Sequence, residues 1–577
     1  MRSAFLTRYA PLLTGALLLA ALPAAGAQAG TAPSGGPMRA RITGAALPYT
    51  SRTPSGQAPA APAGLPPKKQ QIKVLTAALN LMHKNYVKDK FAQVTPGPMD
   101  IFDYGIGALW KKGIDGAGTT VAVIEGWDFP GITKQVAQFD KALGLPNPQI
   151  KTIFPDGKLP KNCPAGMVKL GSFGSCNAWE GELALDVMSA HLVAPYAKIV
   201  ISATPADSQI TDDASFQVAP PEMMKALEFI AAHHVANSIS ISDGIGESSY
   251  SHGSVEVTSQ DPGELAAAAA GIPVLVATGD CGVVQNLPVA NSQCGNASRE
   301  PDTAAWDDSP WTTAVGGSIP NLSNSGVKLG SDPVWHVGGI FSEGAGYSSI
   351  YARPSYQNSV AKITGSPMRS VPDITMDAQD GTSEAAPLLN GVLALATQLN
   401  HDHNLGPINP ALYAMGPHGA AAGIADVIHG NDSVTSGSKT LVQGFTAAKG
   451  FDVATGWGTV NGNFESSLVA FTKANHQEAA ARNQARAQLN ALETRSIRLT
   501  PGTIAKGGSS YLFAPGFLPG HPVTLLIDGK KVTTLVAGAL GTVTDMVVPS
   551  QLKLAPGRHT VELESLVVNE TASFTTK

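Results

Sequence analysis

The stretch EGELALDVMSAHLVAPYAKIVISA, residues 180–203, predicts a helix that leads into a buried strand. Residues 180–191 have the apolar spacing of a helix, and Pro195 lies just beyond the end of that pattern. Lys198–Ala203 is a short run of mostly apolar, β-branched residues, as expected for a strand covered on both faces. A helix followed directly by such a strand favours an α/β fold.

The same alternation of strands and helices continues along the chain. Further strand-like runs lie at 119–125, 237–242 and 273–279, and helix-like segments lie at 221–235 and 263–270. Because successive parallel strands are joined by right-handed crossovers, this alternation predicts a parallel sheet with helices on both faces. Catalytic groups in such sheets lie beyond the carboxyl ends of the strands. Polar residues just after each run are therefore the candidates for a site.

Length and composition indicate a globular chain with more than one domain. The 577 residues exceed what one ordinary core holds, and 43% of them are hydrophobic against 14% charged. The net charge of −5 is small for this length. Composition therefore gives no indication of nucleic acid or an anionic membrane as a partner.

Residues 1–29 have the pattern of a secretory signal peptide. Arg2 and Arg8 are followed by an apolar run and by Ala27-Gln28-Ala29, a small-residue motif that predicts cleavage after Ala29. An uncleaved anchor helix is the alternative, but the apolar run is short and broken by Pro23. No later segment is apolar for long enough to span a bilayer. We therefore predict a secreted, extracellular protein.

Shifts in composition divide the rest of the chain. Residues 30–95 are rich in Pro and Ala and are interpreted as an extension or short propeptide, with an amphipathic stretch at 70–87. The compact region is expected to begin near Pro96, and the α/β domain extends over 96–475. Residues 476–497 are rich in Ala, Gln and Arg and predict a helical linker.

The last segment, 498–577, has the pattern of an all-β domain. Two strand-like runs within 523–536 flank Asp528-Gly529, which is a strong hairpin signal. Further short strands with Gly and Pro turns follow. We expect a small β-sandwich.

Four cysteines predict two disulfides. Cys163 and Cys176 are thirteen residues apart, and so are Cys281 and Cys294. Export favours disulfides, and among the three possible connectivities we expect the local pairs 163–176 and 281–294. A zinc site is the alternative, but the usual C-x2-C spacing is absent. Each loop would constrain the unfolded chain by about 3 kcal/mol.

Ser383 stands in DGTSEAAPLLNGVLAL, residues 380–395, at the start of a long apolar helix. Free backbone N–H groups and the positive end of the helix dipole there stabilise a developing negative charge. Ser383 is thus a candidate nucleophile, although by position alone it is more often only a helix cap. A nucleophilic Ser needs a base, usually His held by Asp. His191 is the best placed of the 13 His, but a lone His on an apolar helix is more often a packed side chain.

Two carboxylates offer another base. Glu182 and Asp186 are four residues apart and so share one face of the predicted helix. A solvated helix face is the ordinary explanation, but no Lys or Arg on that helix is placed to pair with either acid. Two close carboxyls in apolar surroundings repel each other, so one keeps a proton at raised pKa. Such a pair can accept a proton from Ser at acid pH, where an ordinary His is already charged.

Asp280 directly follows the strand-like run that ends in ATG, where a parallel sheet carries its site. An ionised Asp would repel an oxyanion, whereas a protonated Asp could donate a hydrogen bond to it. The ordinary explanation is an Asp in a turn. The functional interpretation again requires acid conditions.

Together these features resemble the sedolisin family of serine-carboxyl peptidases over residues 96–475. The family motif E-x-x-L-D is similar to residues 182–186, S/T-G-D-x-G to residues 278–282, and G-T-S-x-x-x-P to residues 381–387. The sequences APYAKI after the helix, TAVGG at 313–317 and VPDIT at 371–375 resemble further family landmarks. The resemblance implies a subtilisin-like fold in which Ser, Glu and Asp replace the Ser-His-Asp triad.

The resemblance also implies a role for each matched residue. Ser383 would be the nucleophile, and Glu182 the general base and then the general acid. Asp186 would orient Glu182 and share its proton, and Asp280 would hold the oxyanion. Glu125 stands where some members have an accessory Glu in the proton network. Asp243 stands where some members carry Trp, and it receives no role.

One structural calcium ion is a further implication of the resemblance. The matching ligands are the carboxylates of Asp426 and Asp452 and the backbone carbonyls of Val427, Ala448 and Gly450. These are hard oxygen donors, as calcium requires. Members often have Gly in place of Ala448, and a carbonyl ligand tolerates that change.

Two features depart from the family pattern. Members usually carry a long folded propeptide, whereas only residues 30–95 separate the predicted signal from the catalytic region here. The C-terminal sandwich is an addition, and it resembles bacterial Ig-like modules that often attach enzymes to a surface or polymer. Fold analogy alone suggests that role.

We therefore predict a secreted, acid-active serine-carboxyl endopeptidase that acts on polypeptides, binds calcium and is monomeric. A tripeptidyl exopeptidase of the same family is the closest alternative. A non-catalytic secreted binding protein is an alternative of another class, although the intact catalytic positions argue against it.

Overall fold

The computed structural model describes residues 64–88, 96–164, 167–168, 175–204, 220–287, 294, 297–436, 440–475, 477–493 and 497–577. The predicted signal peptide lies outside the described residues. No helix in these ranges is long and apolar enough to cross a membrane.

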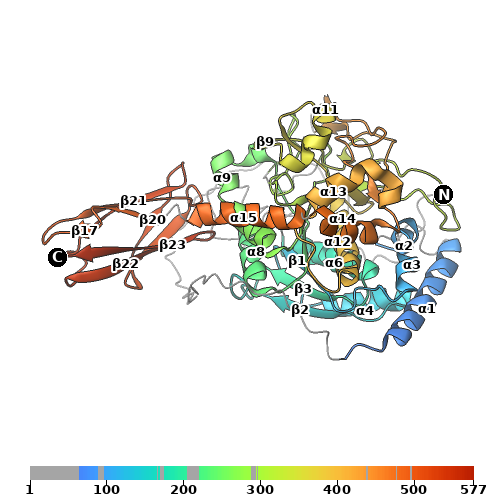
Figure 1. Ribbon diagram of the computed structural model, residues 1–577, viewed down its shortest axis with the longest axis horizontal. Helices are drawn as coiled ribbons and strands as arrows, with labels where there is room; N and C mark the ends of the chain where they lie inside the picture. The colour runs from blue at the N-terminus through green and yellow to red at the C-terminus, as the bar shows by residue number, and fades with distance from the viewer. Residues whose placement is uncertain are drawn as a thin grey trace, which may run out of the picture.

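The main domain is built on a seven-stranded sheet with the strand order β11-β6-β5-β4-β1-β3-β2 (Figure 1). Every strand in it pairs parallel with its neighbours, which confirms the predicted sheet. The strands are β1 (Thr120–Glu125), β2 (Gln149–Ile153), β3 (Lys198–Ala203), β4 (Ser238–Ile241), β5 (Val274–Ala277), β6 (Thr313–Ser318) and β11 (Ile374–Asp377). This order places the carboxyl ends of β5, β4 and β1 side by side.

Helices cover both faces of the sheet, and every strand except β2 is buried along nearly its whole length. One face carries α4 (Ile132–Leu143), α6 (Cys176–Val193) and α12 (Thr382–Leu399), which share a core with Val121 and Val123 of β1. The other face carries α8 (Glu222–His233) and α10 (Asp261–Ala270), which share a core with Ala122 and Ile124 of the same strand. Alternate residues of one strand thus supply the two cores.

The compact region includes α1 (Lys68–Val87), although the sequence led us to expect its beginning near Pro96. Leu75, Ala78 and Met82 of this helix are buried in the main core. The helix contacts α2 (Pro98–Asp103), α3 (Ile106–Trp110) and α4. The amphipathic stretch therefore packs onto the α/β domain through its apolar face.

Both predicted disulfides are confirmed. Cys163 pairs with Cys176 and Cys281 pairs with Cys294, with Cα–Cα distances of 5.9 and 4.9 Å. Cys176 is the first residue of α6, and Cys281 follows Asp280. Each cross-link thus lies close in sequence to one of the candidate catalytic segments.

The predicted linker helix is α15 (Gln477–Glu493), and it packs against the main domain. Its Ala485 shares a small core with Leu265, Ala268 and Ala269 of α10, and Arg486 donates a hydrogen bond to the carbonyl of Ala269 at 3.2 Å. In Figure 1, α15 runs from the main domain towards the C-terminal strands.

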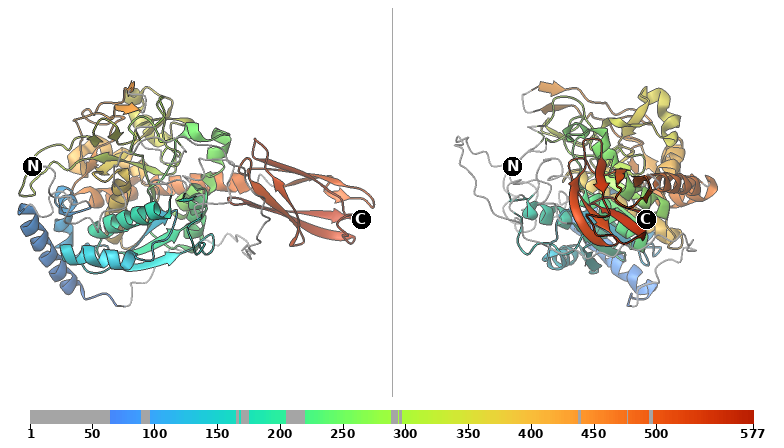
Figure 2. Two further views of the ribbon diagram at one scale, coloured as in Figure 1. Left: turned by 180° about the vertical axis from the view of Figure 1, so that it is seen from behind. Right: turned by 90° about the vertical axis from the view of Figure 1, so that its left-hand side faces the viewer.

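The C-terminal strands form two packed sheets that project from the end of the molecule opposite α1 (Figures 1 and 2). One sheet contains β16 (Arg498–Thr500), β18 (Ser510–Pro515) and β21 (Thr542–Val547). The other contains β17 (Thr503–Ile504), β19 (Pro522–Ile527), β20 (Lys530–Val536), β22 (Gly557–Glu564) and β23 (Asn569–Thr576). The hairpin predicted at Asp528-Gly529 is confirmed, and both turn residues have positive φ.

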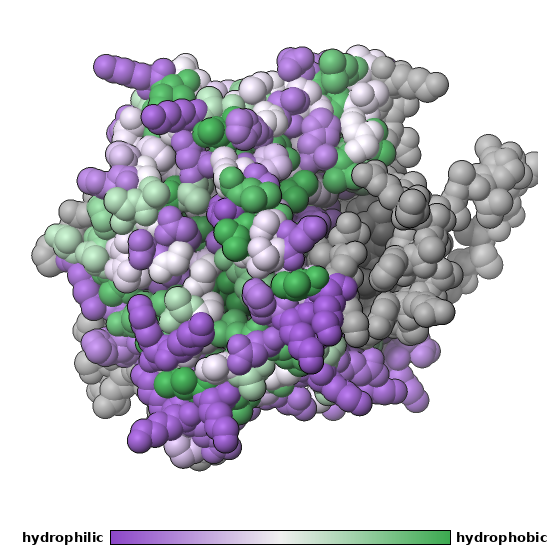
Figure 3. Space-filling view, turned by 90° about the vertical axis from the view of Figure 1, so that its right-hand side faces the viewer, coloured by the Kyte–Doolittle hydropathy of each residue, from purple (hydrophilic) through white to green (hydrophobic). Residues whose placement is uncertain are grey.

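The surface around α1 is mixed in character. Figure 3 views the molecule from this end, and hydrophobic residues are interspersed with hydrophilic ones over the part drawn in colour. Single exposed apolar residues of this kind are normal for a protein surface.

Candidate active site

The carboxyl edge of the sheet collects the predicted catalytic residues. Glu125 is the last residue of β1, Ser242 and Asp243 follow β4, and Asp280 lies three residues beyond β5. The helices α6 and α12 pack against each other on one face of the sheet. They carry Glu182 and Asp186, and Ser383, respectively. A parallel sheet with packed helices thus brings distant residues to one place.

Ser383 lies in the first turn of α12, and its side chain does not cap the helix. Gly381 occupies the N-cap position with a φ of 91°, a conformation that favours glycine. A Cβ atom at that position would lie 2.7 Å from Oδ2 of Asp280. Gly381 therefore lets the nucleophile turn approach the Asp280 carboxyl closely.

Glu182 is partly buried on α6 and forms a hydrogen bond with Ser383. Burial raises the pKa of Glu182 to about 7, the hydrogen bond with Ser383 lowers it, and the Asp280 and Asp380 carboxylates raise it further. The contact places a carboxyl of raised proton affinity beside the candidate nucleophile. In its ionised form Glu182 can accept the Ser383 proton.

Asp186 is fully buried one turn after Glu182. The Ser242 Oγ lies 3.0 and 2.9 Å from Oδ1 and Oδ2 of Asp186, within hydrogen-bond distance of either oxygen. Burial and the Glu182 carboxylate raise the pKa of Asp186 well above its ordinary value, against the lowering effect of Ser242. Two adjacent carboxyls of this kind share protons, so neither titrates independently.

Asp280 is held against the start of α12 by Thr382. Its Oδ1 accepts hydrogen bonds from the Thr382 N–H at 2.8 Å and from the Thr382 hydroxyl at 3.0 Å. The Thr382 oxygen in turn accepts from the N–H of Gly279 at 3.0 Å. Burial raises the pKa of Asp280, and the bonds from Thr382 lower it. Because Oδ1 is occupied, Oδ2 is the oxygen that can carry a proton towards a substrate.

Two further acids lie at the same edge. Glu125 is fully buried, and burial together with Asp186 and Glu182 raises its pKa well above the ordinary value. Burial raises the pKa of Asp243 in the same way, with a smaller contribution from Glu182. Glu125 adjoins the Glu182–Asp186 pair.

His191 is a packed side chain, which confirms the ordinary interpretation. It is fully buried, and its Nε2 lies 2.9 Å from Oδ1 of Asp140 on α4. His191 lies on the same helix as Glu182 and Asp186, but its contact is with Asp140 and not with Ser383. Among the described residues, the possible base in contact with Ser383 is therefore the Glu182 carboxyl, whereas His191 contacts Asp140.

The predicted calcium ligands lie in two loops, one after β12 (Ile424–Ala425) and one before β15 (Thr459–Val460), and a hydrogen bond joins the two loops. The N–H of Gly450 donates to Oδ2 of Asp426 at 2.8 Å, and the N–H of Ala448 donates to Oδ2 of Asp452 at 2.7 Å. Oδ1 of Asp426 is buried and has no hydrogen-bond partner among the described residues. Burial and, to a smaller extent, Asp426 raise the pKa of Asp452 to about 6. Two close carboxyls with an unsatisfied oxygen fit a hard cation.

A second acidic group could also bind a metal. Asp100 of α2, Asp377 at the end of β11 and Glu384 of α12 are buried, and one oxygen of each lies within 4.8 Å of the others. Burial raises the pKa of Asp100 to about 6 and the pKa values of Asp377 and Glu384 well above the ordinary range. Sequence reasoning missed this group because Asp100 is far from the other two along the chain, and because the recognised motifs at 371–375 and 381–387 assign no role to Asp377 or Glu384.

Sequence reasoning also missed Ser242 and Thr382. Thr382 directly precedes Ser383 in the recognised G-T-S motif, and this position could have identified it as a candidate site residue. Ser242 ends the strand-like run at 237–242, where a small hydroxyl residue is not distinctive.

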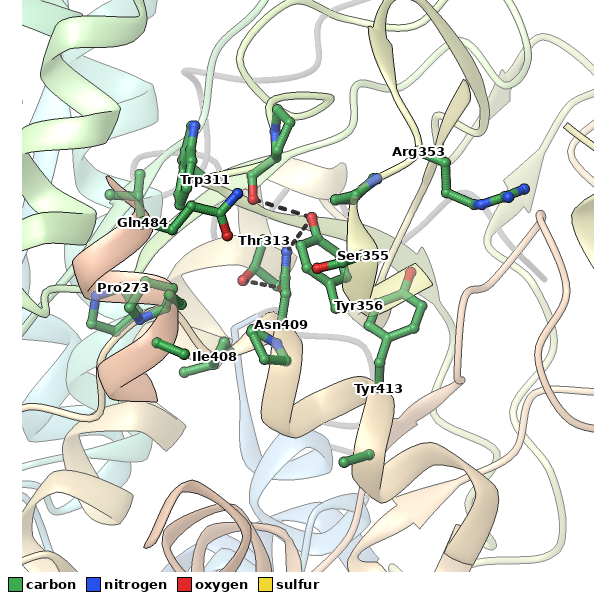
Figure 4. A pocket seen from close by; sticks show the side chains of 18 of the residues that line it. Pro273, Trp311, Thr313, Arg353, Ser355, Tyr356, Ile408, Asn409, Tyr413 and Gln484 are labelled. Carbon is green, nitrogen blue, oxygen red and sulfur yellow. Dashed lines mark hydrogen bonds between the residues drawn. The ribbon is translucent and has the colours of Figure 1, made fainter. Parts of the chain in front are cut away.

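A cavity of about 620 Å³ lies away from these acids (Figure 4). Its lining includes Pro273 just before β5, Thr313 at the start of β6 and Gln484 of α15. Asn409 donates to the hydroxyl of Tyr356 within it at 3.1 Å. The lining contains no acid, His or Cys, so this cavity offers no candidate nucleophile and base.

No family model matches the chain. Comparison with known proteins finds similar peptidases. Kumamolisin of Bacillus sp. (strain MN-32) is 28% identical over 378 residues, which cover 61% of this chain and 60% of kumamolisin. Tripeptidyl-peptidase 1 of Macaca fascicularis and of Homo sapiens are each 30% identical over 230 residues, 34% of this chain and 37% of the relative. The chain thus spans about 60% of the length of kumamolisin.

Among solved structures, Pseudomonas sedolisin, a serine-carboxyl proteinase complexed with pseudo-iodotyrostatin, superposes with a TM-score of 0.50 at 24% identity. The superposition covers 63% of this chain and 94% of that structure. It shows that the α/β domain has the same fold.

Proposed function

We propose an acid peptidase, on the premise that about 60% of this chain is homologous to the sedolisin–kumamolisin family of serine-carboxyl peptidases. The observation that carries the proposal is the convergence of Ser383, Glu182, Asp186 and Asp280. They come from three separate segments of the chain and meet at the carboxyl edge of the parallel sheet.

Glu182 is proposed as the general base and Ser383 as the nucleophile. Glu182 accepts the Ser383 proton while the Ser oxygen attacks the scissile carbonyl carbon, which gives a tetrahedral oxyanion. When the oxyanion collapses, the carbon–nitrogen bond breaks and Glu182 returns the proton to the leaving amine. An acyl-enzyme remains on Ser383, and water attacks it through the same proton transfers.

Asp280 is proposed to bind the oxyanion in its protonated form. Thr382 fixes Oδ1, so a proton on Oδ2 can be donated to the developing negative charge. Ionisation of Asp280 would replace this donor with a repelling charge. Activity should therefore fall as pH rises through the pKa of Asp280, which burial raises.

Calcium is proposed to bind between two loops, one with Asp426 and the other with Asp452, and the carbonyls of Val427, Ala448 and Gly450 are proposed as further ligands. The buried, unsatisfied Oδ1 of Asp426 supports this assignment. When bound, the ion would supply positive charge that neutralises the two carboxylates and stabilises the loops.

Substrates are proposed to be polypeptides cleaved internally by a secreted enzyme. The C-terminal sheets are proposed to form an Ig-like module that attaches the enzyme to a surface or polymer. Product analysis on a long peptide tests the mode of cleavage. Internal fragments from the earliest times are expected, and steady release of N-terminal tripeptides would contradict endopeptidase action.

The catalytic assignment is tested by peptide hydrolysis in acid with wild type, Ser383→Ala and Glu182→Gln. Both variants should lose turnover, because one lacks the nucleophile and the other lacks the base. Cleavage by Ser383→Ala at the wild-type rate would overturn the assignment. Absence of cleavage by processed, calcium-loaded wild type would favour a binding protein.

A further inference from the structure

Ser242 places a hydroxyl between the candidate acids and the nucleophile. It directly follows β4 and is 9% exposed. Its Oγ lies 3.0 and 2.9 Å from the two oxygens of Asp186 and 3.2 Å from the backbone carbonyl oxygen of Ser383. One side chain thus contacts both the acid network and the main chain of α12.

A hydroxyl has a single hydrogen, so Ser242 can donate to only one of these acceptors at a time. With Asp186 ionised, the shorter distances direct that hydrogen to the carboxylate. With Asp186 protonated, the Ser242 oxygen can accept the acid proton and donate its own hydrogen to the Ser383 carbonyl. The contact therefore persists in both protonation states of Asp186.

The surroundings of Asp186 make this donor important. Glu125 faces it from β1, and Glu182 lies on its own helix. Asp243 after β4, Asp280 after β5 and Asp380 before α12 face Glu182. No cationic side chain acts on Asp186 or Glu182 within the described chain. Negative charge on these carboxyls is then stabilised by uncharged hydrogen-bond donors.

We propose that Ser242 is a positioning residue of this peptidase, whose hydroxyl stabilises the negative charge shared by Glu182 and Asp186 and ties it to the main chain of Ser383. The proposal rests on the proposed function and adds a residue to its machinery. Ser242 touches neither the scissile bond nor the transferred proton, so it acts through Asp186.

The predicted consequence is a change in pH dependence. The base must lose a proton before the reaction, and this produces the rising limb of the pH–rate profile. Without the Ser242 hydrogen bond the shared anion is less stable, so its first deprotonation requires higher pH. If Ser242 had a purely structural role, its replacement would lower the amount of active enzyme but would leave the rising limb of the pH–rate profile at the wild-type pH.

The kinetic test compares Ser242→Ala, Ser242→Thr and Ser240→Ala with wild type. Ser240 is a matched control, because it lies two residues earlier on β4 and its Oγ accepts a hydrogen bond from Asn390 at 3.2 Å. Ser242→Ala should lower kcat by about 10- to 100-fold, the loss expected for one hydrogen bond to a charged group. Its rising limb should move up by about one pH unit, with KM changed by less than about threefold.

Ser242→Thr keeps the hydroxyl and should restore most of the rate and the wild-type limb. Ser240→Ala should keep the wild-type limb. A Ser242→Ala profile whose rising limb superimposes on wild type would overturn the proposal. An equal shift in Ser240→Ala would overturn it as well.

A second measurement separates this proposal from the peptidase assignment. The Asp186 carboxyl is titrated by ¹³C NMR in the Ser383→Ala background, with its signal identified by Asp186→Asn. Adding Ser242→Ala should raise the Asp186 midpoint. A shifted midpoint in a protein whose wild type lacks peptidase activity would refute the proposed function and keep the Ser242 contact. Peptidase activity with an unmoved midpoint and limb would refute the Ser242 proposal alone.

Discussion

At the scale of single residues, Asp280 shows how the fold controls a carboxyl. Thr382 donates two hydrogen bonds to one of its oxygens and leaves the other towards Gly381 and the nucleophile turn. Burial raises its pKa, so the neutral donor persists to higher pH than in a free Asp. The same carboxyl would repel an oxyanion once ionised.

Substitution of Asp280 separates these two effects. Asp280→Ala removes the donor and should lower kcat by about 10²- to 10³-fold at acid pH. Asp280→Asn keeps an uncharged donor at every pH, so the falling limb of its pH–rate profile should move to higher pH. A falling limb that stays at the wild-type position in Asp280→Asn would show that another group causes it.

The residues that sequence could identify are those in recognisable motifs. Glu182, Asp186, Asp280 and Ser383 stand at fixed places in short patterns, and the structure brings them together. Ser242 and the Asp100–Asp377–Glu384 group are not identified in this way, since their significance depends on which elements become neighbours. Their identification required the strand order and the packing of α2 and α12.

At the scale of elements, alternation of apolar strands and helices was sufficient to predict the parallel sheet and the helices on both faces. The strand order was not predicted, because the sequence pattern contains no information on which strands pair. The packing of α1 was also not predicted. Its flanking Pro- and Ala-rich segments suggested an extension, whereas Leu75 and Met82 are buried in the main core.

Two acidic groups compete as the calcium site, and substitution distinguishes them. Calcium at about 100 times its Kd should stabilise wild type by about 2.7 kcal/mol. Asp452→Asn should abolish this gain in thermal unfolding, because it removes a charged ligand of the Asp426 loop. Glu384→Gln is the matched control and should retain the gain. The reverse outcome would place the ion at Asp100, Asp377 and Glu384.

At the scale of the whole molecule, buried carboxyls with raised pKa values extend beyond the candidate site. Burial raises the pKa of Asp432 and of Glu465 to about 8. Neither oxygen of Glu465 has a hydrogen-bond partner among the described residues. Below these pKa values the carboxyls are protonated, so the fold then buries neutral groups in place of charges.

The sign of the pH effect follows from linkage. A carboxyl whose pKa is raised in the folded state binds more protons there than in the unfolded state, so stability falls as pH increases. The loss begins near the unfolded pKa of about 4 and is complete above about 8 for Glu465. The free energy of unfolding should therefore be highest in acid and decrease towards neutral pH.

Glu465→Gln tests this effect at one position. The variant should match wild type at about pH 3, below the ordinary pKa of Glu, where Glu465 is protonated in both states. Near pH 8 it should be more stable by on the order of a few kcal/mol, because it avoids a buried charge. Chemical denaturation at both pH values measures the difference. Equal stability of the two proteins at pH 8 would contradict the raised pKa.

The most direct test of the central claim is the rate of peptide hydrolysis at about pH 4 by calcium-loaded wild type, Ser383→Ala and Glu182→Gln. Circular dichroism and thermal unfolding confirm that the variants are folded. Wild type is expected to cleave, and each variant is expected to lose at least about 10³-fold in kcat, as when one member of a catalytic group that acts as a unit is removed. Cleavage by folded Ser383→Ala at the wild-type rate would contradict this expectation.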